Sequence, residues 1–238
     1  MVESIPDELL HNLEAYRSSD AVANLSLYRL YPDEEYLVKK YFKPGDKVLD
    51  LACGMGRTTL LLHEMGYAVR GIDRSEVLIE IAHRRLPYLD LRVGSYDQIE
   101  ELDASYPNIL ISLNGIDYAF PVEQRLRALK ECARVLTPGG IFIYSSHNLK
   151  SMHLFSPYYR ERKRWKIRNC LKAFKTWSYL DEEGLHTFYA RYEHVLEQSE
   201  AVGLRLLEMK WFPKFGIDRL DRYLSPYIQY VFTKPATI

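Results

Sequence analysis

The sequence predicts an α/β protein in which helices cover both faces of a mostly parallel sheet. Three observations point to this fold class. Short runs rich in Val, Ile and Leu recur along the first 148 residues, and segments with helical spacing separate them. Strands of a parallel sheet are buried on both faces, which favours this composition. A chain of 238 residues also fits one α/β domain with an elaboration better than two equal domains.

The first 148 residues carry the regular alternation. Two amphipathic helices are expected first, and the second of them has Pro32 in its opening turn. A later helix stops at Gly66, and Ser75 caps the one after it. Helices are predicted over residues 6–17, 32–42, 58–65, 75–85 and 121–136. Strands are predicted over residues 47–51, 67–73, 89–93, 109–113 and 141–145.

Beyond residue 150 the alternation stops. Residues 151–180 hold eight basic side chains and one acid, Glu161. Two strands over 176–180 and 185–192 are separated by a short acidic turn that ends in glycine, which predicts a hairpin. A helix and two final strands follow, over residues 193–201, 204–212 and 227–233.

Composition narrows the classes of protein that fit. The 32 basic and 32 acidic side chains balance, so no whole-protein attraction to nucleic acid or anionic lipid is expected. Three cysteines without a repeated spacing predict neither a disulfide framework nor a metal cluster. No signal peptide and no apolar stretch of about 20 residues is visible, so a cytoplasmic protein without a membrane span is expected. A monomer and a homodimer fit equally well.

A loop poor in side chains follows the first strand. Ala52, Gly54 and Gly56 let the backbone turn sharply and approach a ligand. In a parallel sheet this loop faces the crevice in which nucleotides bind. Asp73 ends the next strand, where a carboxylate can accept hydrogen bonds from both hydroxyls of a ribose. The competing interpretation of Asp73 is a helix cap before Ser75.

The residues of this loop discriminate between two kinds of nucleotide. A dinucleotide site reads G-x-G-x-x-G and presents its amides to a pyrophosphate. Here the first glycine is replaced by Ala52, and Thr59 stands at the third glycine of a frame begun at Gly54. Asp50 also places a negative charge beside the loop, which suits an ammonium group better than a phosphate. The loop therefore favours a nucleoside that carries an amino acid.

Three ordered motifs resemble those of class I S-adenosylmethionine-dependent methyltransferases. Residues 48–56, VLDLACGMG, are similar to the first motif, residues 71–75 to the second, and residues 134–140 to the turn before the fifth strand. The resemblance implies a Rossmann-like, seven-stranded, mostly parallel sheet whose last strand is inserted antiparallel. It also implies S-adenosyl-L-methionine as cofactor and a lid insertion between the fifth and sixth strands. The expected parts are residues 1–150 with the N-terminal helices and cofactor-binding core, 151–192 as the basic helical and hairpin lid, and 193–238 as the rest of the core sheet.

The resemblance also implies roles for single residues. Asp50 lies beside the methionine ammonium, Asp73 holds the ribose hydroxyls, and Arg74 covers the adenine. Family members often have Gly-Asp after the third strand, but this chain has Ser95 there, so either Ser95 or Asp97 is left to bind the adenine amine. Family members also usually have an acid entering the fourth strand, where this chain has an asparagine. The full expected cofactor set is Asp50, Ala52, Cys53, Gly54, Gly56, Asp73, Arg74, Ser95, Tyr96, Leu113 and Asn114.

Candidate catalytic residues lie near the predicted strand ends. His147 is the first choice for a general base, because the end of the fifth strand faces the acceptor pocket in this fold. Asp117 and His186 are the other candidates. The competing interpretation of His147 is a hydrogen-bonded loop histidine with a structural use only.

The predicted function is methyl transfer from S-adenosylmethionine to an oxygen or nitrogen of a small molecule, such as a metabolite, natural product or sugar. A first alternative is an RNA methyltransferase that uses basic residues 160–175. Against it stand the neutral charge and residues 114–117, NGID, in place of an Asn/Asp-Pro-Pro-Tyr/Phe motif. A second alternative is a partner subunit that binds the cofactor without catalysis.

Overall fold

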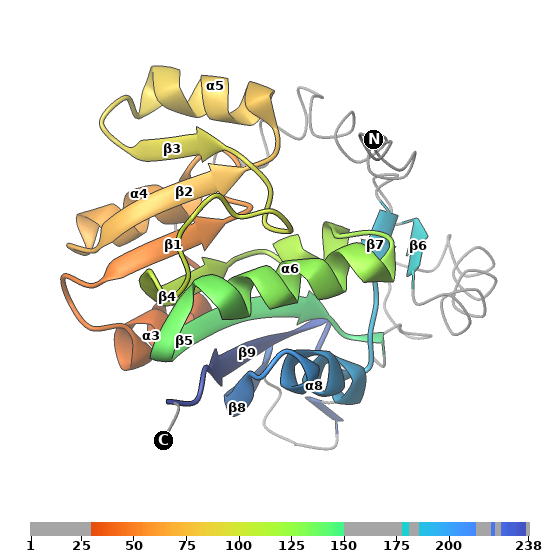
Figure 1. Cartoon of the computed structure of the whole chain (residues 1–238). Coiled ribbons are helices and arrows are strands. Elements are labelled where there is room, and N and C mark those ends of the chain that lie inside the picture. The colour runs from red at the N-terminus through yellow and green to blue at the C-terminus, as the bar shows by residue number, and fades with distance from the viewer. Residues whose placement is uncertain (1–29, 150–177, 181–185, 213–219, 222–224, 237–238) are drawn as a thin grey trace.

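The computed structural model describes residues 30–149, 178–180, 186–212, 220–221 and 225–236. Within these residues seven strands form one sheet in the order β3-β2-β1-β4-β5-β9-β8 (Figure 1). The first five strands are parallel to one another, and β9 runs antiparallel to both of its neighbours. The predicted fold class is confirmed. The strands are β1 (Lys47–Leu51), β2 (Ala68–Asp73), β3 (Asp90–Val93), β4 (Tyr106–Ile111), β5 (Leu136–His147), β8 (Arg205–Phe212) and β9 (Tyr227–Thr233).

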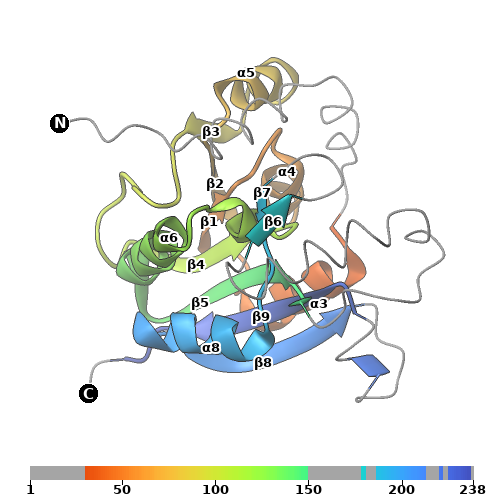
Figure 2. The same ribbon diagram turned by 90° about the vertical axis from the view of Figure 1, so that its right-hand side faces the viewer.

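Helices cover both faces of the sheet (Figure 2). The face of α3, α4 and α5 is sealed by two apolar clusters, in which Leu37 of α3 and Leu62 of α4 pack on the sheet and Leu78 of α5 packs near β3. On the other face α6 and α8 pack on Leu49, Phe142 and neighbouring side chains. Burial from both sides explains why the central strands β1 and β4 are apolar along most of their length. The helices are α3 (Pro32–Tyr41), α4 (Arg57–Glu64), α5 (Glu76–Arg85), the 3₁₀ helix η1 (Gly115–Tyr118), α6 (Val122–Val135) and α8 (Tyr192–Ala201).

Strand β5 is longer than predicted. The Pro-Gly-Gly turn expected over 137–140 lies inside the strand, because Leu136 pairs with Tyr106 of β4 before the register shifts. The shift absorbs the extra residues, and Gly139 adopts a left-handed φ of 76° there. At its other end β5 continues through His147, so the histidine expected in a loop lies on a strand.

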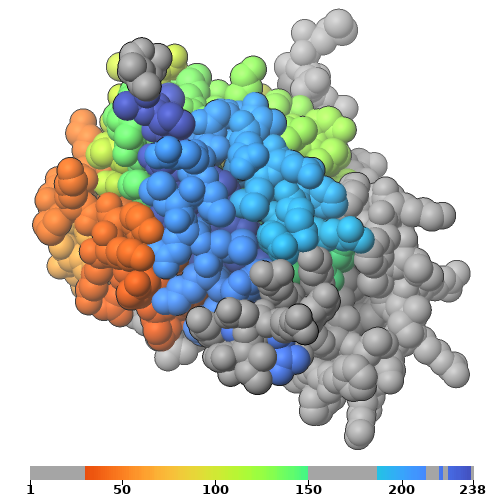
Figure 3. Space-filling model, turned by 90° about the horizontal axis from the view of Figure 1, so that it is seen from below, coloured from red at the N-terminus to blue at the C-terminus, as the bar shows by residue number. Residues whose placement is uncertain are grey.

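Strand β9 lies between β5 and β8 and completes the sheet. Four aromatic rings on these strands contact one another, and their centroids are 4.9 to 6.1 Å apart. Strand β8 also reaches α3 on the face seen in Figure 3, where Lys40 pairs with Glu208 at 2.7 Å. The four rings are those of Phe142 and Tyr144 on β5 and of Tyr230 and Phe232 on β9.

The insertion after β5 is described only in part. Strands β6 (Ser178–Leu180) and β7 (His186–Phe188) pair antiparallel, as the predicted hairpin requires, and α8 begins at Tyr192. The helix predicted over 6–17 and the basic residues 160–175 lie outside the described residues. Among the described residues no helix is long and apolar enough to cross a bilayer.

Candidate active site

The loop between β1 and α4 is held in a left-handed conformation. Ala52, Gly54 and Gly56 have φ values of 57°, 57° and 82°, a region that glycine enters without strain. A Cβ atom built on Gly54 meets no described atom within 4 Å. The loop therefore leaves one bare stretch of backbone open to a ligand, as the sequence predicts.

Asp50 lies directly under this loop and is fully buried. The hydroxyls of Thr58 and Thr59 both donate to its Oδ2 atom, at 2.5 and 2.6 Å. Its Oδ1 atom is buried and has no hydrogen-bond partner among the described residues. Burial raises the pKa of Asp50 to about 6 from an ordinary value of 3.8. Burial of a charged carboxylate costs free energy. One oxygen of this carboxylate can still accept a hydrogen bond from a donor on a ligand.

Asp73, at the end of β2, connects the loop to the next helix. The N–H of Gly54 donates to Oδ2 and the N–H of Ser75 donates to Oδ1, each at 2.8 Å. The contact with Ser75 is the one that the helix-cap interpretation requires. Asp73 is still partly exposed, and each carboxylate oxygen can accept a second hydrogen bond. Capping and ligand binding are therefore compatible at this residue.

Arg74, which follows β2, and Asp97, which follows β3, form an ion pair. Nη2 of Arg74 donates to Ser95 Oγ at 2.5 Å and to Asp97 Oδ1 at 2.9 Å, and Ser95 also donates to Asp97. Gln124 donates to Oδ2 of Asp97 at 3.0 Å. Both oxygens of Asp97 therefore have protein partners. Burial raises the pKa of the neighbouring Tyr96, so its phenol stays protonated.

A buried ion pair between Arg57 and Glu34 lies beside the same loop. Arg57 opens α4, and its Nη1 lies 3.2 Å from Oε2 of Glu34 in α3. Ser112, just after β4, hydrogen-bonds to both charged groups. The ring of Tyr31 packs 5.3 Å from the guanidinium. These contacts fix the first turn of α3 against the ends of β1 and β4.

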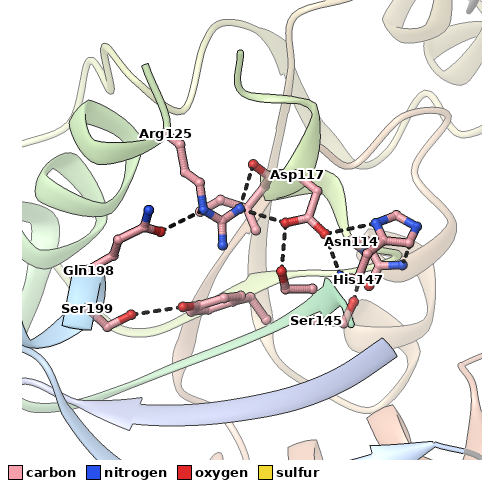
Figure 4. Close-up of polar contacts among 10 residues, drawn as sticks. Asn114, Asp117, Arg125, Ser145, His147, Gln198 and Ser199 are labelled. Carbon is pink, nitrogen blue, oxygen red and sulfur yellow. Dashed lines mark hydrogen bonds and ion pairs between the residues drawn. The ribbon is translucent and has the colours of Figure 1, made fainter. Parts of the chain in front are cut away.

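His147 and Asp117 meet at the end of β5 (Figure 4). Nδ1 of His147 lies 2.9 Å from Oδ2 of Asp117, and the backbone N–H of His147 donates to the same oxygen at 2.6 Å. Nε2 lies 3.3 Å from Nδ2 of Asn114, and the imidazole packs 4.6 Å from the ring of Tyr189. Asp117 is fully buried, whereas the histidine side chain remains 18% exposed. The structure thus brings two of the three catalytic candidates into direct contact.

The turn after β4 holds Asn114 beside this histidine. Leu113 and Asn114 have consecutive left-handed φ values of 49° and 56°, which cost energy for residues other than glycine. The Ser145 hydroxyl accepts the backbone N–H of Asn114 at 2.8 Å. A Cβ atom on Gly115 would approach Cβ of Ala52 to 2.8 Å. The turn therefore packs against the loop after β1, so the two regions form one site.

Comparison with known proteins finds a methyltransferase domain in part of this chain. Residues 48–140, from β1 into β5, match a family model described as a methyltransferase domain. A demethylmenaquinone methyltransferase of Symbiobacterium thermophilum is 34% identical over 122 residues, which are 46% of this chain and 45% of the relative. Residues 48–140 therefore match a methyltransferase domain, and the chain resembles proteins named as methyltransferases, among them S-adenosylmethionine-dependent ones.

Two further comparisons extend beyond the matched core. A ubiquinone biosynthesis O-methyltransferase of Coxiella burnetii is 28% identical over 181 residues, which cover 74% of this chain and 70% of the relative. The solved structure of an S-adenosylmethionine-dependent methyltransferase from Methanosarcina mazei shares the fold, with a TM-score of 0.67 and 19% identity over 87% of this chain and 99% of that one. The chain spans only 39% to 45% of the length of the first three curated relatives that it matches.

The loop and the two carboxylates fit S-adenosylmethionine, the cofactor of the family. The unpartnered Oδ1 of Asp50 lies under the loop, where an ammonium group would supply the missing donor. The bare face of Gly54 admits a ligand close to the backbone, and the partly exposed Asp73 retains acceptor capacity. Burial raises the pKa of Cys53 in this loop well above its ordinary value, so its thiol stays protonated.

The structure also contains site residues that the sequence reasoning missed. Glu34, Arg57 and Arg125 all lie in buried ion pairs near the loop ends. A signal for two of them exists, since Arg125 is in helical phase with Leu129, and Glu34 likewise falls on the buried face of its helix. A charge within an apolar stripe indicates a buried pair. The third catalytic candidate, His186, opens β7, but its side chain lies outside the described part of the structure.

Proposed function

We propose that this methyltransferase transfers the methyl group of S-adenosylmethionine to a hydroxyl oxygen of a small molecule, with His147 as general base. The observation that carries the proposal is the contact between His147 Nδ1 and Asp117 Oδ2, at 2.9 Å, beside Asn114. The bound cofactor supplies a methyl carbon already activated by a positive sulfur.

The hydrogen-bond partners of the imidazole define its tautomer. A carboxylate only accepts hydrogen bonds, so the shared proton belongs to Nδ1 of His147. With the proton on Nδ1, Nε2 carries a lone pair that can accept a hydrogen bond. Its 3.3 Å contact with the Asn114 amide is long for a hydrogen bond, and a substrate hydroxyl that donates to Nε2 would replace it. Asp117 holds the ring as the acid of a catalytic triad does.

An oriented base favours oxygen over nitrogen as the accepting atom. An amine needs only to arrive unprotonated, whereas a hydroxyl becomes a good nucleophile when a base removes its proton. The Coxiella burnetii relative carries the name O-methyltransferase, which supports the same choice. The ring of Tyr189 beside His147 offers an aromatic surface, so aromatic hydroxyls are the first acceptors to test.

The remaining residues bind the cofactor and position the acceptor. Asp50 faces the ammonium, Asp73 the ribose, and the backbone at Gly54 and Gly56 lets the cofactor approach. Leu113 and Asn114 border the sulfonium. Positioning of the nucleophile and exclusion of water supply much of the acceleration in an in-line displacement of this kind.

A methyl-transfer assay with a His147 variant tests the proposal. Purified protein is incubated with S-adenosylmethionine and a panel of phenols, catechols, sugars and amines, and S-adenosylhomocysteine is quantified. His147→Ala should lower kcat about 100-fold or more, the usual contribution of a general base, and leave the cofactor Kd unchanged. His63→Ala, which removes an exposed histidine of α4, is the control. Wild-type turnover of a hydroxyl by His147→Ala would contradict the base, and amine-only products would contradict the accepting atom.

A further inference from the structure

A fully buried arginine lies behind the candidate base. Nη1 of Arg125, on α6, lies 2.6 Å from Oδ1 of Asp117 and donates to the carbonyl of Ile116 at 3.1 Å (Figure 4). Nε donates to Gln198 of α8 at 3.0 Å, and the guanidinium lies 4.7 Å from the ring centre of Phe188 in β7. Four elements, η1, α6, α8 and β7, therefore meet at this side chain.

Stability alone does not account for the pair. Arg125 and Asp117 are both 0% exposed, and the desolvation of two charges often exceeds the energy of their attraction. Nη2 of Arg125 is buried without a hydrogen-bond partner among the described residues, which adds a further cost. Apolar side chains of similar volume commonly fill such a space as well or better. A charge kept at this cost points to a role beyond packing.

The two oxygens of Asp117 have separate tasks. Oδ1 accepts from Arg125 and, at 2.7 Å, from the hydroxyl of Ser146. Among the contacts of the described residues, Oδ2 accepts from His147 through its backbone N–H and through Nδ1. The arginine thus fixes the rotation of the carboxylate and supplies the charge that balances it. Without that charge, a buried anion would face the imidazole directly and hold a proton on it.

We propose that Arg125 is a positioning residue, which acts through Asp117: it orients the carboxylate that holds His147 as a base and balances the negative charge of that carboxylate. The proposal rests on the proposed function. In the step concerned, the acceptor hydroxyl gives its proton to Nε2 while its oxygen forms the new bond to the methyl carbon. The carbon–sulfur bond breaks, and its electron pair stays on sulfur. The imidazolium then returns the proton to water. It does so readily only while the positive charge of Arg125 balances the negative charge of Asp117.

Other ionisable groups lie near the pair in the described part of the chain, among them Tyr189, whose ring is 4.6 Å from the imidazole. Burial raises the pKa of Tyr144 on β5 to about 12 and that of Tyr230 on β9 well above its ordinary value, so neither titrates between pH 5 and 9. Glu193 of α8 also acts on Tyr230 through its charge, and it is the same in every variant below. A change in pH dependence on substitution of Arg125 therefore reports on Asp117 and His147.

The test is the pH profile of kcat/KM in three Arg125 variants. Arg125→Met and Arg125→Gln remove the charge, and the glutamine keeps a donor for Asp117 in case the methionine variant does not fold. Both should lower kcat about 10- to 100-fold at pH 7 and move the acidic limb of the profile about one unit or more to higher pH. Arg125→Lys restores the positive charge but not the forked guanidinium group, so it should return the acidic limb of the pH profile to its wild-type position. Lys130→Met removes an exposed charge from the same helix and should change nothing.

Two results would overturn the inference. One is a loss of rate that is equal at every pH, which indicates a scaffold role only. The other is wild-type activity in a folded Arg125→Gln variant. A failure of the proposed function gives a different result, because in that case the His147→Ala variant would remain active. An inactive His147→Ala variant together with an unshifted Arg125→Gln profile would refute the role of Arg125 alone.

Discussion

At the scale of single residues, Asp50 shows how binding chemistry conflicts with stability. Its carboxylate is buried, and one oxygen has no partner among the described residues. Its folded-state pKa, about 6, lies above the unfolded value of 3.8. Protonation of Asp50 therefore stabilises the ligand-free protein fully below pH 3.8, and this contribution is lost as the pH rises through 6. At neutral pH the charge is kept at the expense of stability.

The same titration should control affinity for the cofactor. Because the ammonium of S-adenosylmethionine pairs with the charged carboxylate, its Kd should rise about tenfold per pH unit below about pH 6. Asp50→Asn should weaken binding about tenfold or more at pH 7.5 and remove this pH dependence. Isothermal titration between pH 5 and 8 measures both, with exposed Asp103→Asn as control. A wild-type Kd that is constant over this range would contradict the assignment of Asp50 to the ammonium.

The sequence predicts a site residue best where a local pattern of neighbouring residues places it. Asp50, Gly54 and Asp73 stand at strand ends in an ordered pattern, so the sequence predicts their place. The ion pair of Arg125 with Asp117 joins two elements through a turn whose shape no local pattern reveals. Such pairs depend on the packing of whole elements, and only the structure shows them.

At the scale of elements, strand β2 packs so closely that only glycine fits at one position. A Cβ atom on Gly71 would lie 2.6 Å from Leu91, 2.7 Å from Thr59 Oγ1 and 2.9 Å from Cys53 Sγ. Thr59 is also a donor to Asp50. The absence of a side chain at this position therefore permits the close contact between β2, β3 and the loop after β1.

Gly71→Ala should lower the free energy of unfolding by about 1–3 kcal/mol, as overpacking of a core does. It should also weaken cofactor binding, because Thr59 must move. Urea denaturation and isothermal titration measure the two effects. Gly94→Ala is the matched control, since its nearest neighbour would be a single methyl group of Ile72 at 3.0 Å. Equal stability of Gly71→Ala and wild type would show that the core relaxes around the added methyl.

The elements themselves were predictable because each has a local signature. Strands β1 and β9 have the predicted bounds, and Ser75 caps α5 as expected, accepting from Leu78. The start of β5 was not predictable, since a Pro-Gly-Gly sequence usually marks a turn. Pairing with β4 overrides that local preference. The short helix η1 was missed for a similar reason, because it owes its shape to tertiary contacts.

At the scale of the whole molecule, the proposed cofactor site joins residues at the ends of the four strands β1, β2, β3 and β4. A ligand that binds only this folded arrangement stabilises it by mass action, by about 2.7 kcal/mol at 100 times its Kd. For a chain of this size the melting temperature should rise by about 5–10 °C. Differential scanning calorimetry with S-adenosylmethionine measures the shift, and nicotinamide dinucleotide is the control. A shift with the dinucleotide alone would contradict the family's cofactor in this protein.

The antiparallel insertion of β9 has a consequence for biosynthesis. A ribosome that has translated as far as residue 226 has produced β5 and β8 but not the strand that separates them. Until β9 emerges, the nascent chain has a free edge on β5, including the backbone that carries His147, which pairs with Tyr227 about 80 residues later. Contacts so distant along the chain form slowly. The edge of β5 that carries His147 is therefore paired only after β9 has docked, and until then it is open to wrong pairing with other strands.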